Sequence, residues 1–235
     1  MITTAPDPDA VALLAAQDFI ELASRAPGSF HVALSGGSTP ARLFAQLVAR
    51  GDEVDWSRVD FWWGDERTVP PDHPDSNFGM ANRLLLEPLG IAASRTHRMM
   101  GEREPEAAAR DYEAALTAAL GSPPVLDYNL LGMGSDGHTA SLFPRSPGLA
   151  EESRYVIANP VDSPLAGGAT TRLTLTFPAI AAARHTRVLV TGAGKAAALA
   201  GVLEGSPGSY PAQRIAGADV RWIVDTAAAA RLRSH

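Results

Sequence analysis

The chain has 235 residues, of which 46% are hydrophobic, and this predicts a single globular domain over residues 1–235. Its 20 lysines and arginines against 26 acidic residues give a formal net charge of −6 at pH 7, which argues against nucleic acid or an anionic membrane as the main ligand. The absence of cysteine excludes disulfides, thiol nucleophiles and thiolate metal sites.

Helical and strand-like segments alternate along the chain. Helices are expected at residues 9–25, 39–50, 78–86, 105–120, 178–184, 196–203 and 226–231, with a helix or tight helical turn at 139–143. Strands are expected at 30–34, 59–63, 125–131, 155–158, 173–177, 187–191 and 220–224, with room for a short one at 96–99. This alternation predicts an α/β fold with an open, mostly parallel, Rossmann-like sheet, helices on both faces and room for a small subdomain. Segment 162–171 contains Pro164 and the pair Gly167 and Gly168, so a mobile loop is expected there.

The first of these strands ends in a glycine-rich stretch, Ser35-Gly36-Gly37-Ser38-Thr39. Thr39 is a good N-cap for the helix that follows, and Pro40 suits its first position. Free backbone N–H groups, small side chains and the helix dipole favour an anion here, above all a phosphate. A tight turn with an N-cap and no ligand would use the same residues, so this motif alone leaves both interpretations open.

A second glycine turn, Gly192-Ala193-Gly194-Lys195, precedes a later helix and adds a cation. It is not a nucleotide-binding P-loop, because Leu189 stands where that motif begins with glycine and Ala196 follows the lysine. The turn favours a sugar phosphate held by Lys195 and backbone amides. The alternative is a solvated lysine in a first helical turn.

The central strand delivers an acid, Asp136, and an imidazole, His138, into a turn that has three glycines in six residues. Histidine titrates near neutral pH, as a general base requires, and a nearby carboxylate can orient the ring and stabilise its charged form. An open α/β sheet binds its ligands at the carboxyl ends of its strands, so we expect the chemical centre at this turn. The alternative is a purely structural histidine.

Other chemistries fit this turn less well. The letters Gly132-x-Gly134-x-x-Gly137 match the dinucleotide fingerprint, but the next expected strand ends at Asn159 rather than at an acid, which argues against a nicotinamide or flavin cofactor. The six histidines show no metal-site spacing, so neither a metal nor a cofactor is expected. Ser141 is not in a G-x-S-x-G elbow and is not expected to be a nucleophile.

A further cluster, Asp65-Glu66-Arg67, follows the strand that ends in Trp63. At a strand's carboxyl end these residues can position a polyol and neutralise an oxyanion, although a surface salt-bridge cluster would have the same composition. The N-terminus lacks a basic region followed by an apolar core, and no uncharged apolar run approaches membrane-spanning length. We therefore expect a cytoplasmic protein with no membrane partner.

In order along the chain, these motifs resemble the 6-phosphogluconolactonase family from the first helix to Asp225. The resemblance is carried by Ser35-Gly36-Gly37-Ser38-Thr39-Pro40, Trp63-Gly64-Asp65-Glu66-Arg67 with Val69-Pro70, Asp75-Ser76-Asn77, Leu131-Gly132-Met133-Gly134-x-Asp136-Gly137-His138-Thr139-Ala140-Ser141-Leu142-Phe143-Pro144, Arg172-Leu173-Thr174 and Gly192-x-x-Lys195. It implies a fold shared with glucosamine-6-phosphate deaminases and ribose-5-phosphate isomerases. It also implies metal-independent hydrolysis of 6-phospho-D-glucono-1,5-lactone to 6-phosphogluconate in the pentose phosphate pathway.

Two comparisons refine this resemblance. Deaminases have Gly-His-x-Ala-Phe-Asn-Glu-Pro at the central turn, whereas this chain continues as Ser141-Leu142-Phe143-Pro144, without the glutamate that ring-opening isomerisation needs. That difference favours the lactonase over an isomerase or deaminase, and a non-catalytic sugar-phosphate binding protein is the other alternative. Lactonases commonly have a Lys-Pro-Pro-rich segment before Arg172, but residues 165–171 here are Leu-Ala-Gly-Gly-Ala-Thr-Thr, so any cationic help from that lysine is lost.

The expected roles follow from the motifs and the resemblance together. The 6-phosphate is expected to bind Gly36, Gly37, Ser38, Thr39, Arg172 and Lys195. His138, oriented by Asp136, is expected to take a proton from the water that attacks the lactone carbonyl. Arg67 and backbone amides near the Gly134 turn are expected to stabilise the oxyanion, while Asp65 positions either the substrate or Arg67. The expected partner is thus a sugar-phosphate lactone, and the protein is expected to be a monomer or a homodimer.

Overall fold

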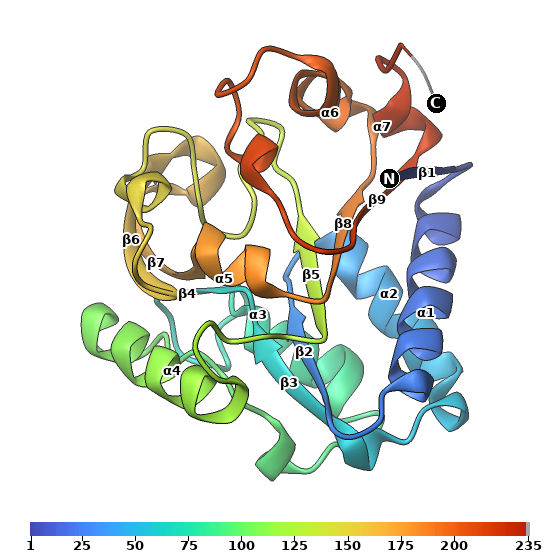
Figure 1. Cartoon of the computed structure of the whole chain (residues 1–235), viewed down its shortest axis with the longest axis vertical. Coiled ribbons are helices and arrows are strands. Elements are labelled where there is room, and N and C mark those ends of the chain that lie inside the picture. The colour runs from blue at the N-terminus through green and yellow to red at the C-terminus, as the bar shows by residue number, and fades with distance from the viewer. Residues whose placement is uncertain (234–235) are drawn as a thin grey trace.

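The computed structural model in Figure 1 describes residues 1–233 and is built around a central six-stranded sheet. The strands lie in the order β1 (Ile2–Ala5), β9 (Val220–Asp225), β8 (His185–Val190), β5 (Tyr128–Gly132), β2 (Phe30–Leu34) and β3 (Val59–Trp63). Every neighbouring pair in this sheet is parallel. The predicted open α/β sheet is therefore confirmed.

Helices cover both faces of this sheet (Figure 1). They are α1 (Pro8–Arg25), α2 (Ser38–Ala49), α3 (Asn77–Ala81), α4 (Pro105–Leu120), α5 (Phe177–Ala182), α6 (Ala196–Glu204) and α7 (Thr226–Ala229). Phe19 of α1 packs edge-on against Phe30 of β2, and Tyr112 of α4 packs edge-on against Trp62 of β3. Phe30 is in register with Val59, and Trp62 lies three positions further along that strand. Because side chains alternate along a strand, α1 and α4 lie on opposite faces.

A second, antiparallel sheet of three strands was not predicted. It has the order β4 (Asp65–Arg67), β7 (Gly168–Leu175) and β6 (Val156–Ser163). The expectation of a mobile loop at 162–171 is wrong, because β6 and β7 pair along their whole length as far as Ser163 and Gly168. The glycine pair that suggested a loop instead closes a hairpin: Gly167 and Gly168 have φ of 84° and 101°, values that glycine adopts without strain.

Two predictions of short elements also fail. Residues 139–143 form neither a helix nor a helical turn, because Ala140 has a left-handed φ of 46° and Thr139 forms an isolated antiparallel bridge to Leu142. Around residues 96–99 only Thr96 bridges to Phe61, so no strand forms. In contrast, the expected helix at 78–86 is present as α3 and a π-helical continuation over Asn82–Leu86.

The remaining differences concern element ends. Helix α2 has Gly37, not Thr39, as its N-cap, and the Thr39 hydroxyl lies 2.8 Å from the hydroxyl of Thr191 instead of capping the helix. The unpredicted strand β1 pairs only with β9 at the sheet edge, where its two threonines stay exposed and leave no apolar run to detect. Within residues 1–233, no helix has both the length and the apolar character needed to cross a membrane.

The strands that carry the central loops are almost completely buried. All five side chains of β3 and four of the five in β2 and β5 are buried. A close-packed interior of this kind resists displacement. The loops that leave the carboxyl ends of these strands are therefore anchored on a rigid edge.

Candidate active site

Four segments at the carboxyl ends of neighbouring strands surround one polar cavity of about 320 Å³. They are residues 35–40 after β2, 65–67 after β3, 132–140 at the end of β5 and 189–195 at the end of β8. This is where an open parallel sheet forms its binding crevice. Of the residues predicted for the site, the cavity is lined by Gly36, Gly37, Ser38, Thr39, Asp65, Arg67, His138 and Lys195.

His138 and Asp136 form a close pair on the turn after β5. Nδ1 of His138 lies 2.6 Å from Oδ1 of Asp136, which also accepts the His138 backbone N–H at 3.1 Å. The ring of Phe143 stacks on the imidazole with centroids 4.0 Å apart. Burial alone would raise the pKa of Asp136, but the hydrogen bond and the charge of His138 lower it. Asp136 does not line the cavity, and because its carboxylate contacts Nδ1, Nε2 is the ring nitrogen that can contact water or substrate.

Gly134 leaves the space that this pair occupies. A methyl group on its α-carbon would lie 2.2 Å from Nδ1 of His138 and 2.6 Å from Oδ1 of Asp136, so no other residue fits without displacing them. The N–H of Gly134 donates to the His138 carbonyl at 2.8 Å, and the N–H of Gly137 donates to the Gly134 carbonyl at 3.0 Å. Because these two amides already donate within the turn, neither is available to the oxyanion that the sequence led us to expect there.

Asp65 is held by two residues to which the sequence motifs assigned no role, Asn77 and Ser141. Its Oδ2 accepts a hydrogen bond from Ser141 Oγ at 2.6 Å. Asn77 Nδ2 lies 2.9 Å from the Asp65 carbonyl oxygen and 3.2 Å from Oδ1. Asn77 itself lines the cavity. The motif Asp75-Ser76-Asn77 is the sequence signal that points to it, although sequence alone does not show which atoms the amide contacts.

The two predicted arginines lie side by side on neighbouring strands of the second sheet. Arg67 on β4 and Arg172 on β7 are in register. Arg67 lines the cavity, and its Nη1 donates to the carbonyl of Asp75. Arg172 is not a lining residue; its Nη2 donates to the Ala166 carbonyl at 2.7 Å. Burial and the adjacent charge of Arg67 lower the pKa of Arg172. Two neighbouring guanidiniums concentrate positive charge on this side of the cavity, which favours an anionic ligand.

Lys195 and Thr39 bring the two glycine turns to the same cavity. The hydroxyl of Thr39 lies 2.8 Å from that of Thr191, which directly links the turn after β2 to the end of β8. Burial lowers the pKa of Lys195, and the charge of Asp136 opposes that shift. Leu165, from the turn between β6 and β7, adds an apolar lining residue that was not predicted. The same cavity is therefore lined by a cation, by a turn suited to phosphate and by His138, which is paired with Asp136.

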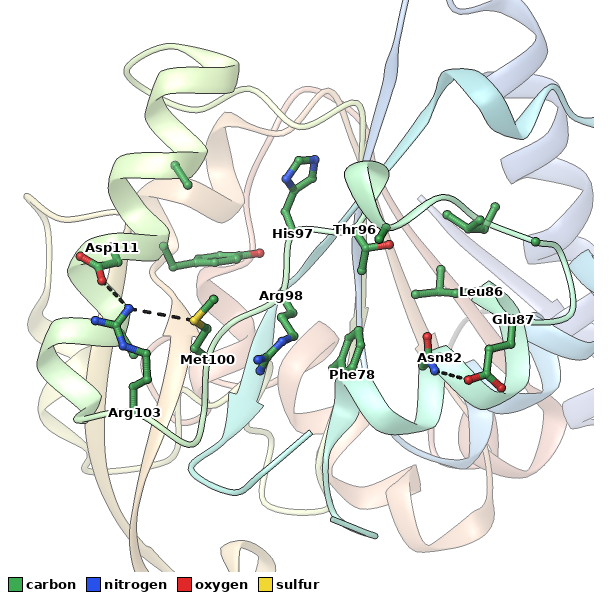
Figure 2. Close-up of a pocket in the computed structure, with 16 residues that line it drawn as sticks. Phe78, Asn82, Leu86, Glu87, Thr96, His97, Arg98, Met100, Arg103 and Asp111 are labelled. Carbon is green, nitrogen blue, oxygen red and sulfur yellow. Dashed lines mark hydrogen bonds and ion pairs between the residues drawn. The ribbon is translucent and has the colours of Figure 1, made fainter. Parts of the chain in front are cut away.

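Elsewhere in residues 1–233 the structure offers a larger cavity but no comparable cluster. This cavity, of about 530 Å³, lies between α3, α4 and segment 90–103 (Figure 2). Four of its polar side chains pair with one another: Arg103 with Asp111 at 2.6 Å and Asn82 with Glu87 at 2.6 Å. No three His, Asp or Glu side chains within the described chain are grouped to hold a metal ion. The smaller, polar cavity is therefore the candidate active site.

Comparisons with known proteins identify the family of the chain. The family described as Glucosamine-6-phosphate isomerases/6-phosphogluconolactonase matches residues 6–224. The 6-phosphogluconolactonases of Haemophilus influenzae and Mycobacterium tuberculosis are 38% and 39% identical to the chain, over 91% and 92% of its length and 91% and 90% of theirs. The structure of 6-phosphogluconolactonase from Trypanosoma cruzi has a TM-score of 0.87 and 30% identity, and the match covers 99% of this chain and 96% of that one.

A monomeric glucosamine-6-phosphate deaminase, only 22% identical, has a TM-score of 0.86 over 98% of this chain and 99% of its own, and so shares the fold. The fold shared with glucosamine-6-phosphate deaminases, which the resemblance implied, is therefore confirmed. With a family match over most of the chain and close relatives along its length, this protein belongs to the glucosamine-6-phosphate isomerase/6-phosphogluconolactonase family.

Proposed function

We propose that this protein hydrolyses 6-phospho-D-glucono-1,5-lactone to 6-phosphogluconate in the pentose phosphate pathway. The observation that carries the proposal is that His138, paired with Asp136, faces the same cavity as the turn at residues 36–39 and Lys195. The names of the Haemophilus influenzae and Mycobacterium tuberculosis relatives support the same reaction. A cytoplasmic location and a monomeric or homodimeric state stay predictions.

The phosphate is proposed to bind at the two glycine turns. The backbone amides of residues 36–39 lie at the N-terminus of helix α2, which starts at Ser38. Free N–H groups and the helix dipole favour an anion there. Lys195 supplies a cation at the same cavity. Arg172 adds charge from beside Arg67, although it does not line the cavity and its Nη2 donates to the Ala166 carbonyl.

The chemistry is proposed to run through Nε2 of His138. One O–H bond of water breaks as its proton passes to Nε2, and the oxygen forms a bond to C1 of the lactone. Asp136 stabilises the resulting imidazolium. When the carbonyl re-forms, the bond from C1 to the ring oxygen breaks and the imidazolium returns its proton to that oxygen. A general base contributes ~10²–10⁴ in rate, which suffices because a lactone is already an activated ester.

Arg67 and Asp65 are proposed to contact different groups of the substrate. The guanidinium of Arg67 stabilises the oxyanion that forms on the lactone carbonyl. Asp65 positions the substrate by accepting a hydrogen bond from a sugar hydroxyl, because its carboxylate is fixed by Ser141 and Asn77 rather than by Arg67. Of the two roles left open for Asp65 by the sequence, the hydrogen bonds thus favour the contact with substrate.

The test is a coupled assay of lactone hydrolysis, corrected for the spontaneous reaction and run with and without a chelator. The wild-type protein should accelerate hydrolysis equally in both conditions. His138→Ala should lose most of kcat while its circular dichroism stays that of the wild type; near-normal turnover would refute the role of His138. If the wild-type protein instead releases ammonia from glucosamine 6-phosphate, interconverts aldose and ketose phosphates, or binds 6-phosphogluconate without any turnover, the proposed function is wrong.

A further inference from the structure

Glu66 is a buried carboxylate that the proposed mechanism does not use. It is 2% exposed, and each of its oxygens accepts two hydrogen bonds. Oε1 accepts the backbone N–H groups of Arg67 and Asn77, each at 2.8 Å. Oε2 accepts the backbone N–H of Phe78 at 2.7 Å and the hydroxyl of Ser76 at 3.0 Å. Burial raises the pKa of Glu66, while these backbone donors oppose the shift.

These contacts fix the start of helix α3. Two of the donors, the N–H groups of Asn77 and Phe78, are the first two of the helix. Ser76 is its N-cap and accepts the N–H of Gly79 at 3.0 Å while donating to Glu66. A backbone N–H can only donate, so an acceptor at this position must offer both oxygens. A carboxylate does this, whereas an amide would turn an NH₂ group toward a donor.

Asn77, which this arrangement holds in place, contacts two separate parts of the candidate active site. Its Nδ2 donates to the carbonyl oxygen of Asp65 and lies 3.2 Å from Oδ1. Its other amide atom lies against the turn after β2: a methyl group on Gly36 would be 1.8 Å from Oδ1 of Asn77. A shift of the first turn of α3 would therefore move both the proposed hydroxyl acceptor and the proposed phosphate turn.

We propose that Glu66 is a positioning residue, which holds the Asn77 amide between Asp65 and Gly36 and so sets the geometry of the substrate cavity. Its catalytic consequence rests on the proposed lactonase function, whereas the placement of Asn77 does not. Glu66 does not line the cavity, and in this proposal it acts on the substrate through Asn77. Removing its carboxylate should therefore cost activity when Asn77 is present and little more when Asn77 is already truncated.

The experiment is a double-mutant cycle on kcat/KM with Glu66→Gln, Asn77→Ala and the double variant. Each single change is expected to lower kcat/KM by about 10- to 100-fold, because misplacing substrate-binding groups by about 1 Å has effects of this size. The double variant should lose little more than Asn77→Ala alone, since residues that act through one another are not additive. Glu66→Asp, which keeps the charge but shortens its reach, enters the same cycle if the Gln variant does not fold.

Glu113→Gln is the matched control. Glu113 is also a carboxylate that accepts backbone N–H groups, those of Tyr155 and Val156, but it does not line the cavity. Its substitution should lower the melting temperature and leave kcat/KM nearly unchanged, with or without Asn77→Ala. This control separates loss of stability from loss of positioning.

A second readout does not depend on activity: the side-chain amide signals of Asn77 in a ¹⁵N–¹H spectrum. These signals should shift in Glu66→Gln and stay in place in Glu113→Gln. Fully additive losses in the cycle, or unshifted Asn77 signals in folded Glu66→Gln, would overturn the positioning role. Absence of lactone turnover in the wild-type protein would instead overturn the proposed function, and the Asn77 signals would still decide whether Glu66 positions that side chain.

Discussion

Replacing Gly134 by alanine tests the His138–Asp136 pair without touching either of its members. The φ of Gly134 lies outside the left-handed region, so the backbone itself tolerates alanine. The added methyl group, however, would lie 2.2 Å from Nδ1 and 2.3 Å from Cε1 of His138. Real Cβ contacts essentially never fall below 3.0 Å, so the ring must move by at least about 0.8 Å.

The ring cannot make this movement and keep its present contacts. Phe143 stacks on its face at 4.0 Å, and the hydrogen bond to Asp136 is 2.6 Å long. A misplacement of about 1 Å typically lowers the rate about 10²-fold, which corresponds to about 2.7 kcal/mol of barrier. Removing the general base altogether costs ~10²–10⁴-fold, so we expect Gly134→Ala to lie near the lower end of that range.

The measurement is kcat/KM in the coupled lactonase assay, with circular dichroism and thermal unfolding to establish that the variant is folded. Gly28→Ala is the control, because a methyl group there meets no atom within 4 Å and its φ is also outside the left-handed region. It should retain wild-type activity. If folded Gly134→Ala is within about threefold of the wild type, a difference of less than 1 kcal/mol in the barrier, the placement of His138 does not limit catalysis and the proposed mechanism is wrong.

Three further predictions concern charged side chains, two at the candidate active site and one that stabilises the fold. Asp136→Asn removes the charge that stabilises the imidazolium, so kcat should fall about 10²-fold or more at nearly constant KM; an unchanged kcat in steady-state kinetics would contradict this. Lys195→Met should raise KM about 10- to 100-fold for the phosphorylated lactone and barely alter hydrolysis of the unphosphorylated one, and an equal rise for both would show that Lys195 does not recognise phosphate. Burial would raise the pKa of Asp219, but hydrogen bonds from His185 and Arg187 lower it to about 2, from an ordinary value of 3.8. Its ionised form therefore stabilises the fold above about pH 4, and this stabilisation is lost as the pH falls toward about 2. Thermal unfolding over that range should show a shallower acid decline for Asp219→Asn than for the wild type, and equal declines would refute the linkage.

The sequence predicts the central sheet and the place of the cavity because both depend on local patterns. Strands such as 30–34 and 59–63 are apolar runs that stop at glycine-rich or charged turns, and parallel strands bring such turns to one edge. The residues His138 and Lys195, 57 positions apart, could be expected together for that reason. Their chemistry follows from residue type, and their proximity follows from topology.

What the sequence did not predict depends on pairing between distant segments. Strand β4 has only three residues, all charged, and it exists because it pairs with β7, which lies about a hundred residues further along the chain. The hairpin at 162–171 shows the same limit, since its glycines mark a break locally but close a turn once β6 and β7 pair. The role of Asn77 is equally nonlocal, because its amide contacts Asp65 and Gly36, which come from two earlier segments of the chain.

The two sheets meet at Gly64, and this junction explains how three consecutive charged residues take different roles. The N–H of Gly64 donates to the Leu34 carbonyl of the central sheet at 2.9 Å, and its carbonyl accepts the N–H of Leu175 from the second sheet at 2.8 Å. Side chains alternate along the strand that begins there. Asp65 and Arg67 therefore point into the cavity, whereas Glu66 points away from it toward α3. A slip of one residue in the pairing of β4 with β7 would exchange the two sets, turning Glu66 to the cavity and burying an arginine against a helix start. Anchoring the strand at Gly64 to both sheets at once fixes that register, and with it the charges that the proposed reaction requires.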